Sequence, residues 1–133
     1  MRSLRFPPVV ARSLLRLGGV LLIAQTTAAW ALVLGLWTPT GAFVDLPPFT
    51  RNAVVALAVL CPVAAIGTWF VSDWGPVLWA ATVTTLGIAV VVGTPFDTMA
   101  LATFAVHACA FVAWLVSAAR VERRGERGEV LTR

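Results

Sequence analysis

The chain has 133 residues, of which 59% are hydrophobic and only 12% charged, and its net charge at pH 7 is +4. Soluble domains are about 45–50% apolar, and a water-soluble fold of this size needs more polar surface than this composition supplies. The composition therefore excludes an ordinary soluble domain and indicates a membrane protein.

Four apolar stretches without Lys, Arg, Asp or Glu occupy most of the chain, at residues 17–37, 53–71, 76–92 and 99–119. A helix rises about 1.5 Å per residue, so each stretch is about 26–31 Å long and matches the hydrocarbon core of a bilayer. We therefore predict an all-α membrane protein whose transmembrane domain, residues 17–119, holds four helices. The first stretch is longer than the apolar part of a signal peptide and is interpreted as an uncleaved helix.

Charge predicts the topology. Nine of the ten Arg lie in a basic N-terminal tail, residues 1–16, and a charged C-terminal tail, residues 120–133. Short connections make consecutive helices antiparallel neighbours, and the positive-inside rule places both tails in the cytoplasm. We expect an antiparallel four-helix bundle in a bacterial inner membrane. Trp69, Trp74 and Trp79 flank the short turn at 72–75 and are expected at the membrane interface, which Trp prefers.

A layer of polar residues lies near the expected middle of the membrane, and its principal members are Gln25, Thr82, Thr85 and His107. In lipid, such side chains seek partners on neighbouring helices, although Thr can also bond to the carbonyl four residues earlier on its own helix. Pro62, inside the second helix, should leave the carbonyl of Ala58 without its helical donor.

His107 is the one histidine and the candidate cofactor-binding residue. One interpretation is functional: a proton relay, a ligand to a haem or chlorin, or a contact to a quinone head group. The other, which we favour, is a neutral imidazole that forms a hydrogen bond to Gln25 or to a Thr across the bundle. A lone His without a second axial ligand or a neighbouring acid is weak support for a cofactor, so we predict none.

Small residues recur every four positions on the fourth helix, at Ala105, Cys109, Ala113 and Ser117. Such rows allow helices to approach closely in membranes, where van der Waals contact replaces the hydrophobic drive. The row is a candidate packing face, either inside the bundle or against another membrane protein or a second copy of the chain.

The signatures of catalysis and metal binding are missing from the sequence. The chain has no phosphate-binding loop, no HExxH, no paired carboxylates and no Ser/His/Asp set. Cys61 and Cys109 have no metal-type spacing and are interpreted as free packing residues. We predict no catalytic residue and no metal site. The pI of 11.1 comes from the tails, so we expect a lipid bilayer and other membrane subunits as partners, and no nucleic acid.

Two sequence motifs flank the second turn, CPVAAIGTW at residues 61–69 and DWGPVLW at residues 73–79. They occur together with His107 on the fourth helix. With these residues the chain resembles an uncharacterised domain-of-unknown-function family of small four-helix inner-membrane proteins from rhizobial-type alphaproteobacteria. The resemblance covers about residues 52–114. It implies architecture and location, and it transfers no catalytic residue.

The sequence thus favours a non-enzymatic accessory or assembly subunit of a larger inner-membrane complex. Two alternatives remain open at this point. One is a small oligomeric channel or transporter lined by the polar layer. The other is a membrane oxidoreductase accessory that resembles the DoxX group and places His107 near a quinone or haem.

Overall fold

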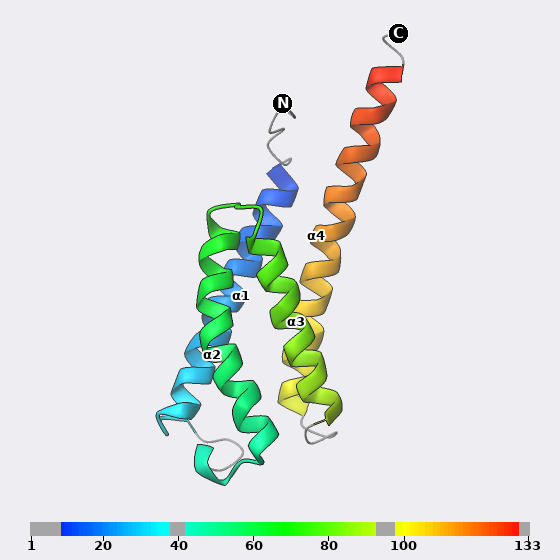
Figure 1. Ribbon diagram of the computed structural model, residues 1–133. Helices are drawn as coiled ribbons and strands as arrows, with labels where there is room; N and C mark the ends of the chain where they lie inside the picture. The colour runs from blue at the N-terminus through cyan, green and yellow to red at the C-terminus, as the bar shows by residue number, and fades with distance from the viewer. Residues whose placement is uncertain (1–8, 38–41, 93–97, 131–133) are drawn as a thin grey trace.

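The structure is a computed structural model that describes residues 9–37, 42–92 and 98–130, with 121–130 given as helical backbone only. The described chain is all-helical, and its long helices are α1 Val9–Val33, α2 Pro48–Trp69, α3 Gly75–Val92 and α4 Thr98–Val130 (Figure 1). A short 3-10 helix, Phe43–Asp45, lies between α1 and α2. Each long helix contains a segment long and apolar enough to cross a membrane, which confirms the predicted all-α class with four such helices.

The ends of α1 differ from the prediction. The helix begins at Val9 rather than at residue 17, so Arg12 and Arg16 lie on it rather than in a separate tail. It ends at Val33 because Gly35 adopts a left-handed φ of 70°. The backbone N–H groups of Gly35 and Leu36 donate to carbonyls of the last turn at 3.1 and 2.8 Å, the bond pattern of a Schellman motif. Residues 1–8 of the predicted tail lie outside the described residues.

α2 begins at Pro48, earlier than predicted, because a proline in the first helical turn gives up no hydrogen bond and has a helix-compatible φ. Pro62 lies inside the helix and has no N–H to donate, so the carbonyl of Ala58 loses its usual partner. The indole N–H of Trp30 on α1 donates to that carbonyl at 3.1 Å. The helix defect that the sequence predicts is therefore repaired by a side chain from the neighbouring helix.

The turn between α2 and α3 brings two backbones into direct contact. The backbone N–H and the hydroxyl of Ser72 both donate to the carbonyl of Gly67, at 3.0 and 2.8 Å, and close the end of α2. A Cβ atom on Gly75 would lie 2.6 Å from the carbonyl oxygen of Gly67 and from the backbone nitrogen of Thr68. Since backbone cannot move aside as a flexible side chain can, this turn requires glycine at position 75.

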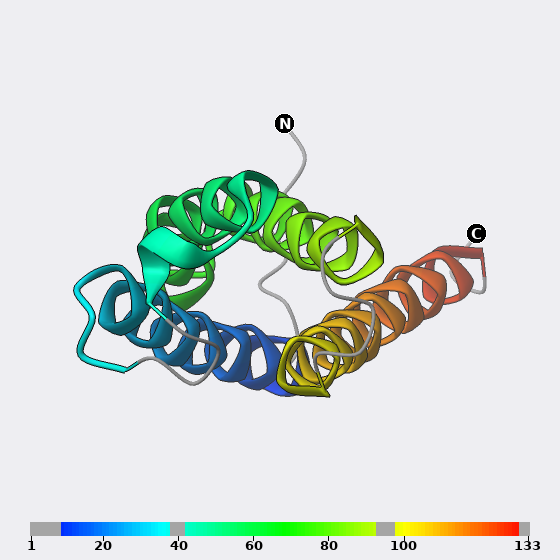
Figure 2. The same ribbon diagram turned by 90° about the horizontal axis from the view of Figure 1, so that it is seen from below.

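The four helices differ in how far the fold encloses them. α2 packs against α1 and α3, and 44% of its span is buried. α4 packs against α1 and α3 with only 6% of its span buried, and its C-terminal part leaves the bundle, as both ribbon views show (Figures 1 and 2). The helix continues to Val130, beyond residue 119 where the fourth apolar stretch ends. Residues 131–133 lie outside the described residues.

The core lies where α1, α2 and α3 meet. Its buried members are mostly aliphatic or small, with one tryptophan: Leu15, Leu22, Leu57, Cys61, Ala64, Ala65, Trp79 and Leu86. The start of α1 and the α2–α3 turn lie toward one end of the molecule, and the end of α3 and the start of α4 lie toward the other (Figure 1). α4 reaches the core through four partly buried residues, Phe104, Ala110, Phe111 and Trp114.

Candidate functional site

Trp79 is the centre of the candidate site, and its side chain faces the inside of the bundle. Its side chain has no exposed surface, whereas Trp69 and Trp74 keep 48% and 45% of theirs. The buried residues of α3 are spaced four, three and four apart and so share one face: Gly75, Trp79, Thr82 and Leu86. Trp79 lies on that face and is therefore covered by neighbouring helices.

Trp79 connects α3 to α4 through His107. The indole N–H donates to Nδ1 of His107 at 3.4 Å, and His107 itself is only 2% exposed. An indole N–H can only donate, so Nδ1 is the acceptor and a neutral imidazole carries its proton on Nε2. The sequence correctly predicts a buried, hydrogen-bonded histidine on α4, but the partner is Trp79 rather than Gln25 or a threonine.

Aromatic and glycine contacts complete the site. The ring of Phe111 meets the ring of Trp79 edge-on, with centroids 5.2 Å apart and an angle of 80° between the planes. Trp114 packs on Phe111 at 5.6 Å. On the opposite side, a Cβ on Gly18 of α1 would lie 2.6 Å from the Trp79 ring. These contacts join three helices in one unit, the Trp79 cluster, which consists of Gly18, Trp79, His107 and Phe111.

The polar layer does not form a connected network among the described residues. The hydroxyls of Thr82 and Thr85 donate to the carbonyls of Leu78 and Ala81 on their own helix, at 3.0 and 2.9 Å. Thr26, Thr27 and Thr84 do the same. Gln25 lies half-buried on α1. Threonines that bond within their own helix present methyl groups to their neighbours, so the layer is much less polar than its composition indicates.

The row of small residues on α4 faces away from the bundle. Ala105, Cys109 and Ala113 are exposed, and Ser117 is half-buried with its hydroxyl bonded to the carbonyl of Trp114 at 2.7 Å. The sequence left open whether this row packs inside the bundle or against another protein. Packing inside the bundle is wrong for Ala105, Cys109 and Ala113, because their side chains are exposed. The bundle-facing side of α4 carries three aromatic residues, His107 and the small Ala110.

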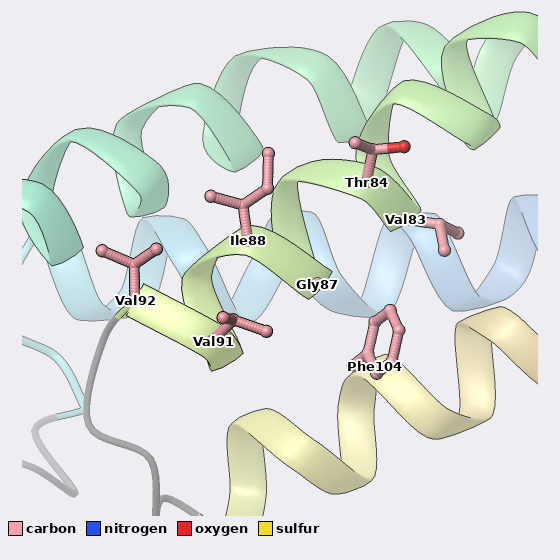
Figure 3. Close-up of a pocket in the computed structure, with 7 residues that line it drawn as sticks. All are labelled: Val83, Thr84, Gly87, Ile88, Val91, Val92 and Phe104. Atoms are coloured by element: carbon pink, nitrogen blue, oxygen red, sulfur yellow. The ribbon is translucent and has the colours of Figure 1, made fainter.

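Two apolar grooves of similar volume lie on the outside of the bundle. One, of about 470 Å³, lies between α3 and α4, where Phe104 closes over Gly87 (Figure 3). The other, of about 460 Å³, lies between α1 and α2. Neither groove includes a residue of the Trp79 cluster, so each is a separate surface.

The cysteines are free: Cys61 is buried beside Thr82 and Cys109 is exposed. Within the described residues, no three His, Cys, Asp or Glu side chains come together in a way that could hold a metal ion. Sequence reasoning missed Trp79 as a partner of His107. The available signal was the spacing that places it on one face with Gly75 and Thr82.

Comparison with known proteins places this chain in a family. A model described as a family of unknown function, DUF6163, matches residues 9–125. The chain belongs to this family. No curated protein and no solved structure matches it. The two sequence motifs and His107 led us to expect an uncharacterised domain-of-unknown-function family, and the match confirms this expectation. The matched residues include α1, α2, α3, the part of α4 up to residue 125 and the whole Trp79 cluster.

Proposed function

We propose that this DUF6163 protein is a non-enzymatic accessory or assembly subunit that binds a transmembrane helix of a larger complex in a bacterial inner membrane. In this proposal the bundle is antiparallel and both ends are cytoplasmic, because nine of ten Arg lie near the ends of the chain. The observation that carries the proposal is the outward row of Ala105, Cys109 and Ala113 on the least enclosed helix.

The chemistry of that row suits a helix partner. Small side chains let a second backbone approach closely, and in lipid this close contact is the main source of helix–helix affinity. On α2 the same residue types are buried against neighbouring helices: Ala58, Cys61, Ala64, Ala65 and Gly67. The fold thus uses small residues where helices meet, and α4 presents a comparable surface that the bundle does not cover.

The polar layer supports an accessory role better than a pore. A water-filled path requires side chains that offer hydrogen bonds to its contents. Here the hydroxyls of Thr82 and Thr85 donate to carbonyls of their own helix, and Nδ1 of His107 accepts the indole N–H of Trp79. Of these three residues, His107 joins two helices, and the two threonine hydroxyls are occupied within α3.

The test is position-specific cross-linking in native membranes. A photoreactive maleimide on Cys109, in a Cys61→Ala background, should form an adduct with one membrane protein. The matched control is Cys109→Ala with Ala110→Cys, because Ala110 packs toward the core and should give no adduct. Ala105→Leu should abolish the Cys109 adduct while the protein remains folded. Adducts with lipid alone, or equal adducts from both positions, would contradict the proposal.

A further inference from the structure

The groove between α1 and α2 runs toward the end of the bundle where α1 begins. Ile23 on α1 and Ile66 on α2 are two of its exposed wall residues, at 53% and 55% exposure, and buried Ala65 lies between the walls. The hydroxyls of Thr26 and Thr27, which also line it, donate to carbonyls of their own helix. The groove therefore offers a hydrocarbon surface along its whole length.

Aromatic side chains lie at the end of this groove. Trp69 and Phe70 line it at the last turn of α2 and are 48% and 76% exposed. The Trp69 ring lies close to α1, because a Cβ on Gly19 would be 3.7 Å from it, an ordinary contact distance. An exposed Trp at the end of a membrane helix is typical of the level where acyl chains meet head groups.

A cation lies on α1 just beyond the level of the Trp69 ring, on the face of α1 that lines the groove. Arg16 is exposed and lies one turn before Gly19. At 3.6 residues per turn it shares a helix face with three further exposed residues: Val20, Ile23 and Thr27. Along this face the surface changes from a guanidinium to aliphatic groups. That order matches a phospholipid, whose phosphate lies above its acyl chain.

We infer that the α1–α2 groove is a binding site for one anionic phospholipid. An acyl chain lies between Ile23 and Ile66, and the phosphate lies against the guanidinium of Arg16. Arg presents a planar fork of donors that fits phosphate oxygens, and a cation near the head groups favours anionic over zwitterionic lipid. The indole N–H of Trp69 is at the height of the ester groups, where it can donate to a lipid carbonyl.

The α3–α4 groove provides an internal comparison. It has nearly the same volume, and Ile88 in its wall is 49% exposed, like Ile66 in the first groove. Neither groove is lined by a cation, but Arg16 shares a face of α1 with Ile23 and Thr27 of the first groove, whereas residues 93–97, which follow α3 in the sequence, contain Asp97 and no Arg. An acyl chain could contact either groove, and Arg16 adds to the α1–α2 groove a charge that selects the head group.

The experiment is native mass spectrometry of the full chain in mild detergent with added lipid. Phosphatidylglycerol and phosphatidylcholine with identical acyl chains are the two probes. We expect one phosphatidylglycerol to be retained at least fivefold more tightly than phosphatidylcholine. Arg16→Gln should remove this preference, a loss of about fivefold for one basic residue at the surface, while Arg16→Lys should keep most of it. Arg120→Gln, which removes an exposed Arg from α4, is the charge control and should change little.

A second pair of variants tests the groove itself. Ile66→Trp fills the α1–α2 groove and should weaken both lipids, whereas Ile88→Trp fills the other groove and should leave retention unchanged. All of these positions are exposed, so unchanged melting temperatures are expected. Equal losses for Arg16→Gln and Arg120→Gln would show diffuse charge attraction and overturn the proposal. Equal retention of the two lipids, or equal effects of Ile66→Trp and Ile88→Trp, would overturn it as well.

Discussion

α2 and α4 are both apolar helices long enough to cross a membrane, but they join the fold by different means. α2 buries small residues against two neighbours, and its end meets α3 backbone to backbone at Gly67 and Gly75. α4 directs its small residues outward and attaches through His107 and Phe111, which meet Trp79. A row of small residues therefore marks a potential contact face, and the surrounding helices decide which partner covers it.

Loss of Trp79 should have the largest effect, because one side chain fills the space between α1, α3 and α4. Trp79→Ala should lower the free energy of unfolding by about 3–5 kcal/mol, the usual cost of deleting a buried tryptophan. Thermal unfolding in detergent measures this. Trp69→Ala, at a half-exposed position, is the matched control and should cost much less. Equal losses would show that α4 does not depend on the Trp79 cluster.

Gly75→Ala tests the α2 side of the comparison. Its Cβ would meet backbone atoms of Gly67 and Thr68, so the helices must separate, at a cost of about 3 kcal/mol. Gly87→Ala on the α3–α4 side would place a Cβ 3.1 Å from the ring of Phe104, which can rotate away. We expect a much smaller change in melting temperature there. A larger effect at Gly87 than at Gly75 would reverse our ranking of the two interfaces.

The bond from Trp30 to Ala58 can be tested by a double-mutant cycle with Pro62. Trp30→Phe removes the indole N–H and should cost about 1 kcal/mol, within the range for interhelical hydrogen bonds in membranes. Pro62→Ala restores a backbone donor to the Ala58 carbonyl, so Trp30→Phe should cost less in that background. Additive free energies of unfolding would show that the indole does not compensate for the proline.

Substitution of His107 measures the weaker, polar attachment of α4. His107→Leu removes the acceptor for the Trp79 N–H and should cost about 0.6–1.7 kcal/mol. His107→Gln retains an acceptor oxygen and should behave nearly as the natural protein does in stability and in cross-linking from Cys109. If the Gln variant is folded but loses a biological activity or a bound pigment, His107 is a ligand or a proton relay instead.

The smallest effect is expected at the outward row of α4. Ala113→Leu should change the stability of the isolated protein by less than about 0.5 kcal/mol, because its side chain is exposed. Ala64→Leu, the same substitution at a fully buried position of α2, should cost about 1–3 kcal/mol. If both variants melt at the same temperature, the row on α4 is packed as closely as the buried residues of α2.

Local sequence signals predicted the elements well but their ends less well. Apolar stretches located all four helices, since only a helix satisfies its own backbone in lipid. The end of α1 depended on Gly35, whose left-handed conformation stops the helix before Leu36 and Trp37 although both are apolar. At Pro62 the sequence correctly indicated an unpaired carbonyl, but the donor, Trp30, lies 28 residues away in the chain.

The candidate site was predicted only in part. His107 was expected to be buried and hydrogen-bonded, and it is. Trp79 was missed because the interfacial preference of tryptophan was given more weight than the helical spacing that puts Trp79 beside Thr82. The direction of the small row on α4 could not be read from the sequence, because nearly every face of that helix is apolar or small.

Local features of the sequence determine that the chain has four helices long and apolar enough to cross a membrane, where their polar and small residues fall, and that Pro62 disturbs α2. These follow from hydropathy, helical period and backbone chemistry, which are local properties. The tertiary structure alone decided that Trp79 is the centre of the bundle, that Trp30 repairs α2 and that the small row of α4 faces outward. In lipid, burial of apolar surface does not distinguish one helix face from another, so the choice of face depends on the fit between side chains of different helices.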